Sequence, residues 1–237
     1  MAQQLIRVRS LKSSVLIRYL TAFALALTAT SGFAQRVQWG VKAGVPITDY
    51  FSALSVPFNP QGRQSYTSST NRYTVGPTIS VSLPFFSALS IEGDALYKRY
   101  HFRGTGFGID TISQEKTTAD SWEFPLMLKY TAKGPLVYPF VDVGVSFHRL
   151  TDVEQTLRNF IVPNPNPFTS STDQPPQLDH RFNTGFVIGG GVDIHVLVLH
   201  LSPEIRYTRW GNQNFRSADG NLTSSQNQAE FLLGITF

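Results

Sequence analysis

The last eleven residues of the chain alternate between apolar and polar or small side chains. Side chains along a β-strand point in turn to its two faces, so this period of two predicts a strand over residues 227–237 with one apolar and one polar face. Leu232 is the one exception, because it falls on the polar face. Counted back from the end, the apolar face consists of Phe237, Ile235, Leu233, Phe231 and Ala229.

Seven earlier segments show the same alternation: residues 37–45, 73–83, 89–97, 122–130, 139–148, 182–194 and 199–207. No charged side chain falls on the apolar face of any of the eight. Each has roughly the 9–11 residues that a tilted strand needs to cross a membrane. A sheet in lipid must be closed, because an open edge would leave backbone groups without hydrogen-bond partners. The sequence therefore predicts an all-β protein, an eight-stranded antiparallel up-and-down transmembrane β-barrel.

The connections between these segments alternate in length. Short links fall at residues 84–88, 131–138 and 195–198, and long ones at 47–72, 98–121, 149–181 and 208–226. Short turns on one rim and long loops on the other are typical of outer-membrane barrels, whose long loops lie outside the cell. Aromatic residues are expected to form a girdle at each rim. The loop-side girdle is predicted from Tyr73, Tyr97, Trp122, Phe147, Phe182, Tyr207 and Trp210, and the turn-side girdle from Trp39, Phe85, Phe86, Tyr130, Tyr138 and Phe237.

The start of the chain has the pattern of a secretory signal peptide. Four basic and no acidic residues precede an apolar run at 19–29, and small residues stand at Gly32 and Ala34. This pattern predicts a cleaved signal peptide over residues 1–34, followed by a single barrel domain over residues 35–237. The four basic residues also account for the whole difference between the chain's 20 basic and 16 acidic residues. The net charge therefore indicates no nucleic-acid partner, and the lack of cysteine excludes a lipid-modified N-terminal cysteine.

Three strand segments carry a resemblance to a known family: Glu123-Phe-Pro-Leu-Met-Leu-Lys-Tyr130, Gly185-Phe-Val-Ile-Gly-Gly-Gly-Val192 and Ser202-Pro-Glu-Ile-Arg-Tyr207. With the final Phe237, they make the chain after residue 34 resemble the bacterial outer-membrane β-barrel (porin-like) family, in its small OmpA/OmpX-like eight-stranded form. The resemblance implies an integral protein of the bacterial outer membrane, in contact with outer-membrane lipid. It also implies insertion by the barrel-insertion machinery, with Phe237 as the assembly signal. It names no activity, because the family includes adhesins and structural anchors.

Charged residues of the strands gather on the face predicted to line the barrel interior. One interpretation is an ion pathway or a catalytic pair of acids, and the other is a network of salt bridges. Eight strands enclose a space just wide enough for side chains, and buried charges need partners, so we expect the network. Its members are Lys42, Glu92, Asp94, Glu123, Lys129, Asp142, Asp193, Glu204, Arg206 and Glu230.

No motif indicates catalysis or a cofactor. Ser146 and His148 lie near the loop-side rim, as in lipid-modifying barrel hydrolases, but no acid accompanies them at a fixed spacing. The five histidines show no metal-ligand spacing, so we expect no metal site and no cofactor. We expect a monomeric barrel with a structural or surface-interaction role through its long loops, whose ligand the sequence does not name. The alternatives are a narrow pore, a lipid-modifying enzyme, and a soluble lipocalin-like barrel, whose apolar face would point inward.

Overall fold

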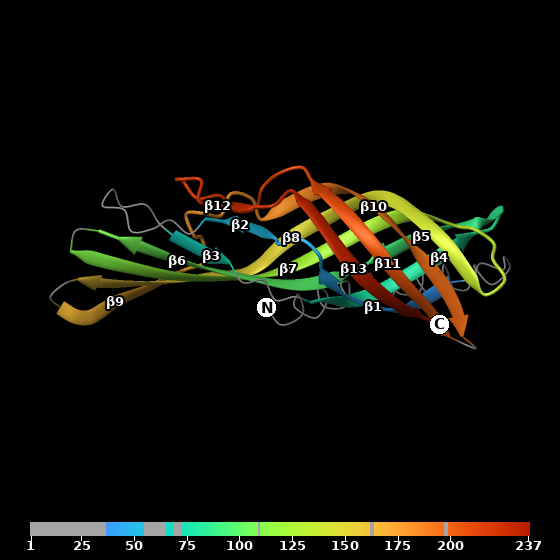
Figure 1. Ribbon diagram of the computed structural model, residues 1–237, viewed down its shortest axis with the longest axis horizontal. Coiled ribbons are helices and arrows are strands. Elements are labelled where there is room, and N and C mark those ends of the chain that lie inside the picture. Colours follow the sequence, from blue (N-terminus) through green and yellow to red (C-terminus); the bar gives the residue numbers. More distant parts are fainter. Residues whose placement is uncertain (1–36, 55–64, 69–72, 109, 162–163, 197–198) are drawn as a thin grey trace, which may run out of the picture.

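The barrel predicted from the sequence is present in the computed structural model. The structure describes residues 37–54, 65–68, 73–108, 110–161, 164–196 and 199–237, so the predicted signal peptide over residues 1–34 lies outside the described residues. Eight antiparallel strands, tilted against the long axis in Figure 1, close into a ring. Within the described part of the chain, no helix has the length and apolar character needed to cross a membrane.

Strands that follow one another in the sequence are neighbours in the ring. The ring strands are β1 (Val37–Pro46), β4 (Thr74–Leu83), β5 (Phe86–Asp94) with its continuation β6 (Leu96–Phe107), β7 (Thr111–Thr131), β8 (Val137–Ile161), β10 (Phe182–Val196), β11 (Leu199–Trp210) and β13 (Asn227–Thr236). The closing seam joins β1 to β13, where Val41 lies opposite Ile235. Backbone hydrogen bonds between Trp39 and Phe237 extend this seam past the last assigned pair. This confirms the predicted fold class.

One ring strand is interrupted at a single residue. Ala95 separates β5 from β6, and its N–H donates to the carbonyl of Pro77 on β4. The backbones of the two neighbouring strands approach closely here: a Cβ atom on Gly76 would lie 1.8 Å from the carbonyl oxygen of Ala95. Glycine at this position therefore permits the irregularity.

The strands at one end run far beyond the ring, which the sequence analysis did not predict. Residues 98–121 and 149–181 were expected to be loops, but 98–107, 111–121, 149–161 and 164–172 belong to β6, β7, β8 and β9 (Asn164–Thr172). Short β3 (Ser65–Ser68) pairs with β6, and the five strands form a sheet that extends to the left in Figure 1. The alternation continues in this sheet, but its outer face is polar, for example at Arg103 and Lys116, so no apolar stripe marked these residues as strand.

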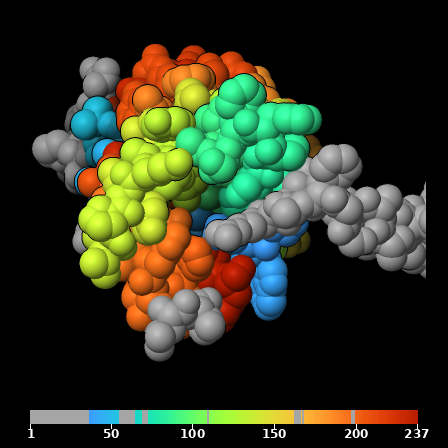
Figure 2. Space-filling view, turned by 90° about the vertical axis from the view of Figure 1, so that its right-hand side faces the viewer, coloured from blue at the N-terminus to red at the C-terminus, as the bar shows by residue number. Residues whose placement is uncertain are grey.

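The opposite end of the barrel is formed by short hairpins, as the link lengths predicted. Figure 2 looks onto this end and shows the hairpins β4–β5, β7–β8 and β10–β11 around the rim. A separate two-stranded sheet, β2 (Phe51–Ala53) with β12 (Leu222–Ser224), belongs to the end with the extended sheet. The two ends are called here the short-turn end and the extended end.

Candidate functional site

The two faces of the ring strands differ in polarity. The outward face of the ring strands is mainly apolar. Its residues include Val41, Leu126 and Ile205, which are 51%, 52% and 59% exposed. Inward residues include charged side chains with almost no exposure, such as Lys42 at 2% and Arg206 at 1%. Leu232, the exception in the terminal alternation, also points inward and is fully buried. An apolar exterior around a charged interior is the reverse of a soluble lipocalin-like barrel, so that alternative is excluded.

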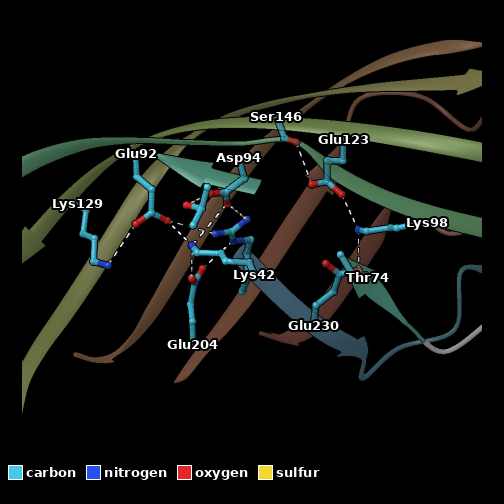
Figure 3. Close-up of polar contacts among 12 residues, drawn as sticks. Lys42, Thr74, Glu92, Asp94, Lys98, Glu123, Lys129, Ser146, Glu204 and Glu230 are labelled. Atoms are coloured by element: carbon cyan, nitrogen blue, oxygen red, sulfur yellow. Dashed lines mark hydrogen bonds and ion pairs between the residues drawn. The ribbon is translucent and has the colours of Figure 1, made fainter. Parts of the chain in front are cut away.

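Two cations and three acids form a central ion cluster inside the ring (Figure 3). Lys42 on β1 contacts Glu92 on β5, and its Nζ lies 2.8 Å from Glu204 Oε2 and 3.5 Å from Asp94 Oδ2. The alternation of β1 directs Lys42 inward, and the same rule directs Glu92 and Asp94 from β5 towards it.

Arg206 on β11 binds the same acids from the other side. Its Nε donates to Glu204 Oε1 at 2.6 Å and its Nη1 donates to Asp94 Oδ2 at 2.9 Å. Its Nη2 lies 3.7 Å from Glu92 Oε1. Thr78 adds a hydrogen bond to Asp94 Oδ1 at 2.6 Å. The central ion cluster therefore joins β1, β4, β5 and β11 across the interior.

A second ion cluster lies nearer the extended end. Lys98 Nζ lies 2.5 Å from Glu123 Oε2 and 2.6 Å from Glu230 Oε1, and Ser146 donates to Glu123 at 2.9 Å (Figure 3). Lys98 is absent from the predicted interior charges, because the apolar alternation ends at Tyr97, where the outer face turns polar. If the alternation is continued by one residue, Lys98 falls on the inner face with Asp94 and Leu96.

Three of the expected interior charges are not central members of these clusters. Lys129 Nζ lies 3.2 Å from Glu92 and 3.7 Å from the centre of the Phe140 ring. Asp142 is buried, but neither of its carboxylate oxygens has a hydrogen-bond partner. Its carboxylate lies next to Gly189, which has no side chain. A Cβ atom added to Gly189 would lie 2.4 Å from Asp142 Oδ1 and 3.0 Å from Glu204 Oε1. Asp193 lies apart from both clusters, beside His195 and His200 at the short-turn end.

A family model described as an outer membrane protein beta-barrel domain matches residues 33–211. The chain belongs to the outer membrane protein β-barrel family. Its location is therefore the bacterial outer membrane. Both the resemblance to this family and the predicted localisation are confirmed. In this setting the apolar exterior faces lipid, and the extended end corresponds to the extracellular side of such barrels.

Solved outer-membrane proteins are similar to this outer-membrane barrel at low identity. OprG from Pseudomonas aeruginosa is 10% identical with a TM-score of 0.45, over 85% of this chain and 93% of that chain. The attachment invasion locus protein Ail of Yersinia pestis, in complex with the heparin analogue sucrose octasulfate, is 7% identical with a TM-score of 0.33, over 85% and 99%. The translocator domain of the autotransporter NalP from Neisseria meningitidis is 10% identical with a TM-score of 0.34, over 95% and 97%. No curated protein matches the chain in sequence.

The rims of the outer-membrane barrel carry most of the predicted aromatic residues, with two corrections. Tyr138, which was assigned to the turn-side girdle, falls on the inner face of β8 with Asp142 and stacks on His195. Trp39, Tyr73, Trp122, Phe147 and Phe182 are exposed on the outer surface, and Trp39 also contacts Phe237 at 5.5 Å between ring centres. Trp210, which was assigned to the loop-side girdle, instead points inward and is 3% exposed. It packs against His148 at 5.2 Å, because the alternation of β11 places residue 210 on the same face as Arg206.

An aromatic cap lies at the extended end of the outer-membrane barrel. Its core packs residues from the connections at 47–72 and 208–226 against the inner face of the extended sheet; the members are Tyr50, Phe51, Tyr66, Tyr100, Phe102, Ala119, Leu150, Val153, Phe215 and Leu222. Tyr50 stacks on Tyr100 at 3.7 Å, and Phe215 contacts both Phe51 and Phe102 edge-on. The connections expected to be open loops are thus partly folded into a compact core.

A polar layer borders the aromatic cap. Gln177 donates to both carboxylate oxygens of Glu115 at 3.1 Å and to the hydroxyl of Tyr66 at 3.2 Å. Burial raises the pKa of Glu115 above its ordinary value, and the hydrogen bond from Gln177 opposes this rise. Gln155 completes the layer through hydrogen bonds to Glu115 and Gln177.

Ser146 and His148, the candidate hydrolase pair, have separate partners. Ser146 donates to Glu123, and His148 Nε2 lies 2.5 Å from the hydroxyl of Ser121. The Nδ1 atom of His148, where an orienting acid would bind, has no hydrogen-bond partner. Both residues are buried, 0% and 2% exposed, between the aromatic cap and the second ion cluster.

Proposed function

We propose that this outer-membrane barrel is a closed, monomeric scaffold that presents an extracellular sheet to surface ligands, and that it neither transports solutes nor catalyses a reaction. The observation that carries this proposal is the extended sheet. From Thr111 to Trp122, strand β7 continues for roughly 35 Å beyond the aromatic rim, at about 3.3 Å per residue. Ordered sheet this far outside the lipid is accessible to partners at the cell surface, where exposed connecting segments commonly carry binding functions.

The closed interior supports the same proposal. Ion pairs fill the cross-section at Lys42 and Arg206, and the aromatic cap covers it on the extracellular side. We infer that contact with outer-membrane lipid and insertion by the barrel-insertion machinery apply to this chain as to its family. A monomer agrees with the ring, because a closed sheet leaves no unpaired edge at the level of the lipid.

We expect no steady conductance from the refolded protein in planar lipid bilayers. The reason is that both ion clusters and the aromatic cap leave little room for water inside eight strands. The measurement is a single-channel recording, with protein-free bilayers as the control. Large and steady conductance would support the narrow pore instead of the scaffold. A lipid-modifying enzyme has less support, because Ser146 and His148 are buried and separately bonded.

The outer face of the extended sheet has a basic cluster suited to anions. Arg103 on β6 lies directly opposite Lys116 on β7, and Arg158 lies one strand further, opposite Gln114. The three cations line an open concavity of about 520 Å³ with Thr105 and Thr156. Glu115 also lines it, but its carboxylate accepts hydrogen bonds from Gln155 and Gln177. Like charges placed opposite each other in a sheet are destabilising, so an anionic ligand would relieve their repulsion. The proposed ligand is a phosphorylated or sulfated saccharide.

A triple substitution, Arg103→Ala, Lys116→Ala and Arg158→Ala, should weaken binding of dextran sulfate at least about tenfold, or about 1.4 kcal/mol. The control variant, Lys133→Ala, Arg209→Ala and Arg216→Ala, removes equal charge elsewhere on the exposed surface and should bind normally. Neutral dextran should not bind to any of them. Binding to lipopolysaccharide micelles, measured in parallel, separates a ligand of the bacterium's own surface from an external one. Equal losses in the two triple variants would show an effect of net charge and contradict the proposed site.

A further inference from the structure

A cluster of possible metal ligands lies at the short-turn end, away from the ion clusters and the extended sheet. His195 on β10 and His200 on β11 are directly paired across the hairpin, and Asp193 lies two residues before His195 on the same face of its strand. We propose that Asp193, His195 and His200 bind a divalent first-row transition-metal ion at the periplasmic mouth of the barrel. This site is independent of the extracellular role proposed above.

The distances within the cluster suit a shared metal ion. His195 Nε2 lies 3.9 Å from Asp193 Oδ2, and His200 Nδ1 lies 3.8 Å from Asp193 Oδ1. The three possible ligand atoms all lie within 4.8 Å of one another. Two ligands that each lie about 2.0–2.2 Å from one Zn²⁺ ion can be at most about 4.4 Å apart. Small rotations of the partly exposed imidazole rings would therefore bring all three atoms into coordination range.

Neighbouring side chains hold two of the three ligands in place. The Ser202 hydroxyl donates to Asp193 Oδ1 at 3.2 Å, and the Tyr138 ring stacks on His195 at 4.3 Å. Such outer contacts orient metal ligands and commonly contribute to affinity. The third ligand, His200, has the amide nitrogen of Gln38 at 3.4 Å from Nδ1, a contact that a metal ion would replace.

The cluster is open to small solutes. It lines a cavity of about 500 Å³ at the short-turn end, together with Gln38, Tyr138 and two lysines, Lys129 and Lys133. Water from this cavity can complete the coordination shell of the ion. Because the lysines repel cations, the affinity must come from the ligands themselves rather than from a negative surrounding field.

The ligand types select the class of metal. Two imidazoles and one carboxylate suit Zn²⁺, Cu²⁺ and Ni²⁺, whereas Ca²⁺ and Mg²⁺ prefer a shell made only of oxygen. The chain contains no cysteine, so no thiolate competes for these ions. Zn²⁺ is the appropriate first probe, because it has no redox chemistry and adapts to tetrahedral sites that include water.

Titration of the refolded protein with Zn²⁺ in a detergent without metal affinity tests the proposal. We expect saturation at one Zn²⁺ per chain and no binding of Mg²⁺ under the same conditions. His195→Ala and His200→Ala should each weaken binding at least about tenfold, and Ser202→Ala, which removes only an orienting contact, should weaken it by about tenfold or somewhat more. His180→Ala, which removes an exposed histidine near the extended end, is the matched control and should bind as the wild type does.

A measurement on the unaltered chain keeps the test independent of variant folding. The zinc X-ray absorption spectrum of the wild type should show two imidazole nitrogens with additional oxygen ligands at about 2.0–2.2 Å. Absence of stoichiometric binding would overturn the proposal. So would a spectrum without imidazole scattering, or equal weakening by His180→Ala and His195→Ala.

Discussion

Replacing Arg206 by alanine should lower the free energy of unfolding of the barrel by about 3–5 kcal/mol. Arg206 is 1% exposed and lies against Glu204, Asp94 and Glu92. Its removal leaves Lys42 as the main cation for three buried carboxylates, and uncompensated buried charge is costly. The measurement is equilibrium unfolding by urea in lipid vesicles, followed by tryptophan fluorescence.

Two further variants isolate the cause. Arg209→Ala removes an exposed arginine three residues away on the same strand and should change stability by no more than about 0.5 kcal/mol. Arg206→Lys keeps the charge but loses the forked geometry, so an intermediate loss is expected. If Arg206→Ala were as stable as the wild type, water would have to solvate the remaining acids, and the interior would be wet rather than ion-paired.

Replacing Phe215 by alanine should destabilise the aromatic cap by about 3–5 kcal/mol, the usual effect of removing a buried phenyl ring. Phe215 is fully buried and contacts Phe51 and Phe102 at 5.7 and 5.6 Å between ring centres. Phe215 and the cap residues from the connections at 47–72 and 208–226 lie outside the ring strands, so this part of the cap should open locally while the barrel stays folded. Limited trypsin digestion measures this opening, since Arg216 follows directly in the chain.

The matched control for the cap is Phe168→Ala, because Phe168 on β9 is 68% exposed. This variant should resist trypsin as the wild type does. A Phe215→Ala protein that is cleaved no faster would show that the cap does not depend on its aromatic core. Complete digestion of the ring strands in Phe215→Ala would instead mean that the cap and the barrel unfold together.

The ring was predictable from the sequence because lipid imposes a strict pattern on it. Outward positions from Val41 to Ile205 must be apolar, so each strand crossing the membrane is visible as an alternation of period two. The same rule placed the interior charges on one face. Beyond the rim the outer face meets water, and residues such as Arg103 and Lys116 remove the pattern while the strand continues.

The sequence predicts which charged residues line the interior better than it predicts which of them contact one another. The inward direction of Asp142 and Arg206 follows from alternation, but which acid meets which cation depends on strand register and side-chain length. Arg206 reaches Asp94, and Asp142 is left without a hydrogen bond. Likewise, His195 and His200 show no ligand spacing in the sequence, because they meet only across a hairpin. Trp210 was predicted to face outward because it is aromatic. It lies four residues after Arg206 on the same strand, so the alternation places it on the inner face.

The central ion cluster has a consequence for the order in which the barrel assembles. Lys42 and Glu204 are 162 positions apart, and they bond only when the first and seventh ring strands are in place together. Contacts so distant in sequence form late. Until then, each unpaired cation would cost about 2–4 kcal/mol if it faced lipid at the middle of the bilayer. We therefore expect a half-built sheet to stay in water or at the headgroups, and to enter the lipid only when the β1–β13 seam can close.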